Sequence, residues 1–164
     1  MNDKIRKAGV EDMAGVHSLI KELASFEKED NAVELTVKDL QRDGFGEQPL
    51  FTCFIAENQS EIIGIALVYN RYSTWKGKTV HLEDLIVKKD WRGKGIGNSL
   101  FSRVMQFAKG QKVKRVEWNV LDWNTPAIDF YKKNGAKILE GWQVVQMDEA
   151  HLDTFVSSQE KQGV

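Results

Sequence analysis

The sequence is short of several residue types, and each shortage excludes a class of protein. Cys53 is its only cysteine, so no disulfide can form within the chain and a disulfide-stapled secreted framework is excluded. The formal net charge is −1, so no global field would gather nucleic acid or anionic lipid. No apolar run approaches the roughly 20 residues that span a bilayer, and the first residues lack an apolar signal-like core. We therefore expect a cytoplasmic protein with no nucleic-acid partner and no membrane partner.

What the chain does contain suits one folded domain. Its 164 residues include 41% hydrophobic and 10% aromatic side chains, enough to fill a sizeable core. There is no internal repeat and no Pro/Ser-rich linker, and the two prolines each stand at an element boundary. We expect a single domain over residues 1–164, with 158–164 as a frayed polar tail. The three histidines lack metal-ligand spacing, so no metal site is predicted.

Hydrophobic periodicity predicts an α/β chain. Strands are expected at 4–9, 50–58, 61–72, 79–87, 113–121 and 142–147, with the second and third joined as a hairpin. Helices are expected at 11–24, 36–44, 97–110, 125–134 and 148–156. Thr36 is the predicted N-cap of the second helix. For the fourth helix, Thr125 is the predicted N-cap, Pro126 the first helical residue, and Gly135 the residue that follows the C-terminus. This order predicts one strand–glycine loop–helix crossover in the middle of the sheet.

The crossover carries the segment WRGKGIG, residues 91–97. Its glycines allow successive backbone N–H groups to converge on an anion, and a helix N-terminus adds about half a positive charge. Arg92 and Lys94 add two mobile cations, which suits a pyrophosphate. The spacing is not that of a dinucleotide-binding fold, because Asn98 stands where the third glycine is needed, and it is not a Walker loop. A glycine-rich turn with solvated basic residues is the alternative interpretation.

This loop resembles the Q/R-x-x-G-x-G/A pyrophosphate loop of the GCN5-related N-acetyltransferase (GNAT) superfamily. The predicted element order is similar to that of the same superfamily. Further segments, spread over about residues 18–142, resemble the branch that holds spermidine/spermine N1-acetyltransferase and thialysine Nε-acetyltransferase: YSTWKGKTVHLEDLIV, VLDWNTPAIDFYKKNGA and EGW. SFEK, YSTWKG and VLDWN are more similar to the thialysine member. The resemblance implies the GNAT acyltransferase fold, an α/β (α+β) fold with a mixed, mostly antiparallel central sheet and helices on both faces.

Acetyl transfer to an amine first requires that the amine lose a proton. Presenting a lysine-like ammonium in neutral form at pH 7 costs roughly 4–5 kcal/mol, and a carboxylate can hold the ammonium and accept its proton, directly or through water. Glu83 is the candidate base. Strict alternation places it on the face of Leu85 and Val87, while Asp84 points to the other side with Leu82 and Ile86 and reaches the site only if the strand is bulged.

The resemblance also implies a general acid and two sets of binding residues. Tyr131 corresponds to the tyrosine that protonates the departing thiolate, and a backbone N–H near Leu85 to Val87 would meet the oxyanion. The implied contacts of the cosubstrate acetyl-coenzyme A are Leu85, Ile86, Val87, Arg92, Gly93, Lys94, Gly95, Ile96, Gly97, Asn98, Asn124, Thr125, Pro126 and Ala127. The implied amine contacts are Phe26, Glu27, Glu83, Asp84, Glu117, Trp118 and Asn119.

Together with these residues, the resemblance implies an acetyl-coenzyme A-dependent N-acetyltransferase that acts on a small primary amine by direct attack in a ternary complex. A thialysine or lysine-like amine or a diamine is the first expectation, and spermidine or spermine is the alternative. A protein N-acetyltransferase and a non-catalytic coenzyme A-binding module are the further rivals. Cys53 is interpreted as a buried hydrophobic residue, not a nucleophile. A homodimer is implied by the resemblance alone.

Overall fold

A computed structural model describes residues 4–162 of the chain, which divides into two compact units, Met1–Asn119 and Val120–Val164. The first unit is built on one five-stranded sheet in the order β1-β2-β3-β4-β5. Its strands are Lys4–Lys7 (β1), Thr52–Asn58 (β2), Glu61–Ser73 (β3), Gly77–Val87 (β4) and Val116–Glu117 (β5). The first four strands pair antiparallel, and β4 pairs with β5 in parallel. The predicted mixed, mostly antiparallel sheet is therefore confirmed.

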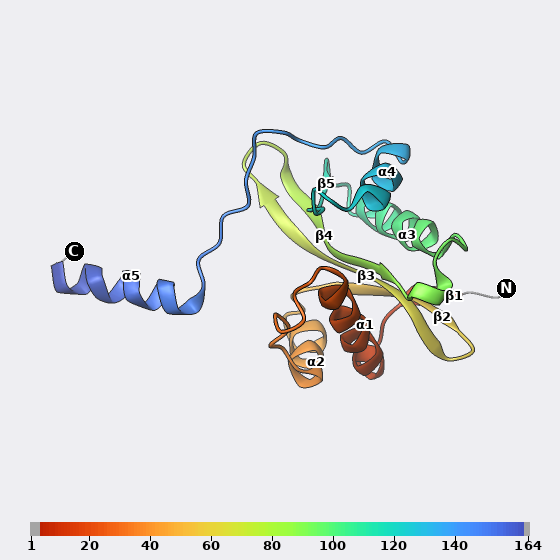
Figure 1. Ribbon diagram of the computed structural model, residues 1–164, viewed down its shortest axis with the longest axis horizontal. Coiled ribbons are helices and arrows are strands. Elements are labelled where there is room, and N and C mark those ends of the chain that lie inside the picture. Colours follow the sequence, from red (N-terminus) through yellow and green to blue (C-terminus); the bar gives the residue numbers. More distant parts are fainter. Residues whose placement is uncertain (1–3, 163–164) are drawn as a thin grey trace. The chain divides into compact units, whose positions relative to one another are not determined.

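Helices cover both faces of this sheet, as predicted (Figure 1). The short 3-10 turn Val10–Asp12 leads into α1 (Met13–Phe26), which lies with α2 (Val37–Phe45) on one face, and α3 (Ile96–Gly110) lies on the other. Each helix buries one apolar stripe: Met13, Val16 and Leu19 in α1, and Leu100 and Val104 in α3. The hydroxyl of Thr36 accepts a hydrogen bond of 3.3 Å from the N–H of Asp39, so the predicted cap of α2 is confirmed.

The second unit contains α4 (Thr125–Lys133) and α5 (Glu149–Gln162). The predicted N-cap Thr125 is wrong by one residue, because the Asn124 side chain accepts the hydrogen bond from the N–H of Ala127 at 3.3 Å. Gly135 follows α4 with φ +87°, the left-handed conformation expected after a helix. Helix α5 continues to Gln162 instead of ending near 156. The interpretation of 1–164 as one domain stays a prediction.

The predicted strand at 142–147 is wrong. These residues form no strand, and no described strand pairs with them. Val145 is 88% exposed. A short apolar segment does not by itself supply the neighbouring chain that a strand needs for its backbone hydrogen bonds. The strand expected at 113–121 is shortened for the same reason, since only Val116 and Glu117 pair with β4.

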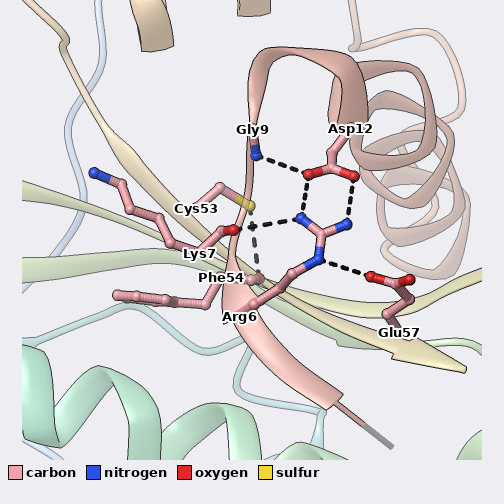
Figure 2. A network of polar contacts seen from close by, with 7 residues as sticks. All are labelled: Arg6, Lys7, Gly9, Asp12, Cys53, Phe54 and Glu57. Atoms are coloured by element: carbon pink, nitrogen blue, oxygen red, sulfur yellow. Dashed lines mark hydrogen bonds and ion pairs between the residues drawn. The ribbon is translucent and has the colours of Figure 1, made fainter. Parts of the chain in front are cut away.

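A network of charged residues fixes the start of α1 against the sheet (Figure 2). The Arg6 guanidinium donates to both carboxylate oxygens of Asp12, at 2.6 and 2.9 Å, and its Nε donates to Glu57 of β2 at 2.7 Å. The N–H of Gly9 adds a further bond of 2.7 Å to Asp12. The hydrogen bonds from Arg6 hold the pKa of Asp12 below its usual range. The network joins residues far apart in the sequence, and sequence reasoning did not find it.

Replacing Asp12 by alanine is expected to lower the free energy of unfolding by about 2 kcal/mol at neutral pH, because a part-buried, charge-assisted pair loses one partner. Since the folded state lowers the pKa of Asp12, its stabilisation is present at neutral pH and is lost as the pH falls through the folded-state pKa. Urea denaturation at pH 7 and near pH 2 measures both effects. Asp43→Ala, which breaks an exposed pair with Arg42, is the control and is expected to cost under about 1 kcal/mol. Equal losses in the two variants would contradict a stabilising role for the network.

Candidate active site

The glycine loop ends in an open helix N-terminus. Gly93 and Gly95 have φ +75° and +85°, a left-handed conformation that other residues adopt only with strain. A Cβ at either position would meet no atom within 4 Å, so backbone conformation and not crowding calls for glycine. The first intrahelical bond of α3 runs from the N–H of Ser99 to the carbonyl of Gly95, at 3.0 Å. The N–H groups of residues 96–98 therefore have no acceptor within the helix, and they fit a phosphate group.

Arg92 connects this loop to two other elements of the first unit. Its Nε donates to the carbonyl oxygen of Val87, the last residue of β4, at 2.9 Å. Its guanidinium carbon lies 5.3 Å from the ring centroid of Phe26, the last residue of α1. Lys94 lies over the ring of Trp91, with Nζ 4.6 Å from the centroid. The structure therefore brings the predicted phosphate loop, the end of β4 and the predicted substrate residue Phe26 together.

Strand β4 contains a bulge at its two acidic residues. Asp84 pairs with Leu67 and Leu82 pairs with Val68, so Glu83 is an extra residue with no partner of its own on β3. Strict alternation is therefore wrong here: Leu82 shares a face with Leu85, and Asp84 lies on the opposite face. The physical reason is that two residues of the bulged strand face one residue of its neighbour, which shifts every later side chain by one position.

The bulge places Glu83 on the face of Asp84, towards α1, and not with Leu85 and Val87 as predicted. Glu83 lies 3.5 Å from His81, measured from Oε2 to Nε2, and its charge acts on Asp84. Burial raises the pKa of Asp84 to about 7, and the charges of Glu83 and Glu27 contribute to the rise. Burial also raises the pKa of Glu27. The charges of two carboxyl groups predicted from the sequence, Glu27 and Glu83, therefore both act on a third, that of Asp84, and we call the three the acidic cluster (Glu27, Glu83 and Asp84).

Glu117 and Trp118, two further predicted amine contacts, have recorded partners outside the acidic cluster. The Glu117 carboxylate is paired with two arginines, Arg71 at 2.9 Å and Arg115 at 2.7 Å. The ring of Trp118 packs edge-to-face on Phe101 of α3, with the centroids 5.5 Å apart. A role of Glu117, Trp118 and Asn119 in binding the amine stays a prediction.

The edge of β4 beyond His81 is open within the described residues. Strand β5 pairs with β4 at Val80 and His81 only, so the segment from Leu82 to Val87 has a strand neighbour on one side, β3. The predicted coenzyme contacts at residues 85–87 lie on this segment. An open strand edge presents backbone N–H and C=O groups that an amide-containing ligand can bond.

Tyr131 and residues 124–127 belong to the second unit, and their part in the reaction stays a prediction. Tyr131 lies in α4, and its side chain is buried. Burial raises the pKa of its phenol to about 12, so the phenol keeps its proton throughout the neutral range. Pro126 stands in the first turn of α4, behind the Asn124 cap.

Sequence reasoning missed two residues that border the acidic cluster. In the sequence, His81 lacks metal-ligand spacing and Arg71 belongs to no predicted motif. His81 is buried, which lowers its pKa, and its Nδ1 lies 3.3 Å from Nη1 of Arg71. The signal that could have found them is the hairpin register, which places Arg71 opposite Thr79 and Tyr69 opposite His81 on the face of Asp84.

The described part of the chain holds neither an exposed cysteine nor a candidate metal site. The thiol of Cys53 is 3% exposed, and burial raises its pKa, so the interpretation of this cysteine as a core residue is confirmed. Among residues 4–162, no three His, Cys, Asp or Glu side chains are grouped so that they could hold a metal ion. Within the same residues, no helix combines the length and the apolar character needed to cross a bilayer.

Comparison with known proteins agrees with the geometry. Residues 16–136 match the acetyltransferase (GNAT) family. The chain is 38% identical over 155 residues to the thialysine N-epsilon-acetyltransferase of Bos taurus, covering 88% of this chain and 91% of that protein. It is 37% identical over 159 residues to the spermidine/spermine N(1)-acetyltransferase-like protein 1 of Homo sapiens, covering 91% of this chain and 23% of that protein.

A solved structure extends the likeness to the fold. The aminoglycoside N-acetyltransferase AAC(6')-Iy, crystallised in complex with CoA, is similar with a TM-score of 0.72 and 17% sequence identity. The match covers 89% of this chain and 95% of that one. At this identity the likeness concerns the arrangement of helices and strands.

Proposed function

Because the chain belongs to the acetyltransferase (GNAT) family and is an N-acetyltransferase, we propose that it transfers the acetyl group of acetyl-coenzyme A to the terminal amine of a small, lysine-like molecule. The observation that carries the proposal is the acidic cluster at the bulge of β4, on the same strand that leads into the glycine loop. Glu83 and Asp84 thus lie near the end of β4, and the phosphate loop follows that strand after the short 3-10 turn Lys89–Trp91.

The loop's own groups would hold the diphosphate of the cosubstrate. The N–H groups of residues 96–98 and the positive end of the α3 dipole favour a diphosphate, and Lys94 adds a mobile cation. Arg92 is held by the carbonyl of Val87, which fixes its position beside the loop. The open edge of β4 at residues 85–87 supports contacts with the amide groups of the coenzyme arm.

The acidic cluster would hold the substrate ammonium and accept its proton. Glu83 is half exposed and can meet an incoming cation, and Asp84, with a pKa of about 7, is a stronger base than an ordinary carboxylate. The amine nitrogen then forms a bond to the acyl carbon, the carbon–sulfur bond breaks, and the thiolate leaves. The phenol of Tyr131 would donate a hydrogen bond or a proton to that thiolate.

Direct attack in a ternary complex is the route that the cysteine content supports. Cys53 is the chain's sole cysteine, it lies in the core, and its thiol has a raised pKa, so it is unsuited to carry a covalent acetyl group. The acetyl group would therefore pass from sulfur to nitrogen in one enzyme-bound complex.

The acceptor's identity is proposed from the relatives. The thialysine N-epsilon-acetyltransferase of Bos taurus is named for a lysine-like amine, which we put first. A diamine belongs to the same first expectation, and spermidine or spermine is the alternative that the human relative's name suggests. Modification of protein lysines or N-termini is a more distant alternative. The homodimer implied by the resemblance also stays a proposal.

An amine panel tests the proposal. Purified protein is incubated with acetyl-coenzyme A and thialysine, lysine, ornithine, putrescine, spermidine or spermine, and thiol release is followed. We expect the highest kcat/KM for thialysine or lysine, about 10-fold or more above spermidine, because an active site that matches one end of its substrate discriminates by roughly 1.4 kcal/mol or more. If spermine gives the highest kcat/KM, the substrate assignment is wrong. A lysine-containing peptide is added as a further acceptor, and thiol release with this peptide but with none of the small amines would favour a protein acetyltransferase.

A further inference from the structure

We propose that Arg71 recognises the carboxylate of an amino-acid substrate and thereby selects lysine-like amino acids over diamines and polyamines. The inference rests on the proposed function and adds a specificity-determining residue to it. It follows from the groups that face the acidic cluster across His81, all of which lie in the first unit.

Arg71 lies on the same face of the sheet as Glu83 and Asp84 of the acidic cluster. It stands on β3 opposite Thr79, and alternation places it on the same face as Tyr69 and Leu67, which pairs with Asp84. The imidazole of His81 stands between the two charged groups, with Nδ1 3.3 Å from Nη1 of Arg71 and Nε2 3.5 Å from Oε2 of Glu83. One imidazole ring therefore separates a guanidinium from the carboxylate that would receive the amine.

The state of His81 follows from its neighbours. A guanidinium can only donate, so Nδ1 of His81 accepts from Arg71, and the ring proton lies on Nε2, towards Glu83. Burial lowers the pKa of His81, Glu83 and Glu117 oppose that shift, and Arg71 adds to it. The ring is thus a neutral spacer that keeps Arg71 and Glu83 apart and fixes the orientation of both.

The charges at the Arg71 end do not cancel. Arg71 and Arg115 both pair with one carboxylate, that of Glu117, so this end retains one positive charge in excess. Arg115 and Glu117 are 37% and 23% exposed, whereas Arg71 is 49% exposed, so Arg71 is the most accessible of the three. Its Nη1 makes both recorded contacts, and within residues 4–162 no bond to its Nη2 or Nε is recorded. Those N–H groups can bind a planar carboxylate.

The part of this face between the acidic cluster and Arg71 therefore has a negative end at the cluster and a positive end at Arg71. A molecule with an ammonium at one end and a carboxylate at the other complements both, with the reacting amine at the acidic cluster. A diamine or polyamine of similar length would bring a second cation against Arg71, which is a repulsive contact. Specificity for the amino acid would thus come from attraction to one substrate class and from repulsion of the other.

Matched substrate pairs test this inference. Lysine and cadaverine, and likewise ornithine and putrescine, share their chain and amine and differ by the carboxylate. We expect the wild-type protein to prefer the amino acid in each pair by about 10- to 100-fold in kcat/KM, the range of a charge-assisted, bidentate contact. In Arg71→Met the preference should fall to near unity through a higher KM for the amino acid, while kcat/KM for the diamine stays equal or rises.

Controls separate recognition from folding. Arg42→Met removes an exposed arginine of α2 and should leave all four rates unchanged. Arg71→Lys keeps the positive charge but loses the planar set of guanidinium N–H donors, so it should retain part of the preference for the amino acid over the diamine. If Arg71→Met lowers both members of a pair equally, or leaves the ratio unchanged, Arg71 has only a structural role and the inference fails. Absence of thiol release by the wild type with every amine tested would overturn the proposed function instead.

Discussion

Tyr131→Phe is expected to lower kcat about 100-fold while the affinity for coenzyme A stays unchanged. The phenol is buried, and its pKa of about 12 keeps it protonated at neutral pH. Full transfer of that proton to a thiolate of pKa about 8.5 would be uphill by roughly 5 kcal/mol. A hydrogen bond to the developing thiolate is therefore the larger expected contribution, and losing such a donor costs on the order of 100-fold.

Thiol release measures kcat, and calorimetric titration with coenzyme A measures the affinity. Tyr72→Phe is the matched control, because Tyr72 is a highly exposed tyrosine on β3 and its loss should change neither quantity. Full activity in Tyr131→Phe would remove this residue from the mechanism and leave protonation of the thiolate to solvent.

Asp84→Asn is expected to lower kcat/KM by about 100-fold near neutral pH, because the strongest base of the acidic cluster is lost. Asp84 must be ionised to accept a proton, so the wild-type rate should rise with pH through about 7, the pKa of this carboxyl group. That limb should be absent from the pH–rate profile of the variant. Asp153→Asn, an exposed position on α5, should retain the wild-type profile. If the rate of Asp84→Asn still rises with pH through about 7 as in the wild type, another group is the base.

The same variant should be more stable than the wild type at alkaline pH. The folded state raises the pKa of Asp84, so the folded protein binds a proton more tightly than the unfolded chain does. The stability of the wild type therefore falls as the pH rises from about 4 to about 7. Removing the charge should add on the order of 3 kcal/mol at pH 8 and little near pH 4. Denaturation at the two pH values would show it, and a variant that is less stable at pH 8 would contradict the assigned pKa shift.

Local signals account for most of the correct predictions of the fold. The Thr36 cap, the hairpin of β2 and β3, and the apolar stripes of α1 and α3 each depend on residues close together in the sequence. The strand expected at 142–147 failed because pairing depends on a distant neighbour. The cap of α4 shifted by one residue because Asn124 and Thr125 are both good capping residues, and their order alone does not decide between them.

In the candidate site, too, the features that depend on pairing between strands could not be predicted from the sequence. The glycine loop and the acidic residues could be named from the sequence, because their spacing and composition are local. The bulge at Glu83 could not, since it exists only in the register between β3 and β4. It reverses the face of Asp84 relative to Leu82, and with it the set of groups that surround the substrate. The pairing of Arg71 with Glu117 likewise requires that three strands lie side by side.

The burial of Cys53 has a practical consequence for chromogenic disulfide reagents such as Ellman's. The native enzyme should contribute almost no colour of its own, because its single sulfhydryl group is shielded by the core. All signal during turnover would then come from the released coenzyme. On denaturation, one further equivalent per chain should react, so a single reagent can report both catalysis and loss of the native state.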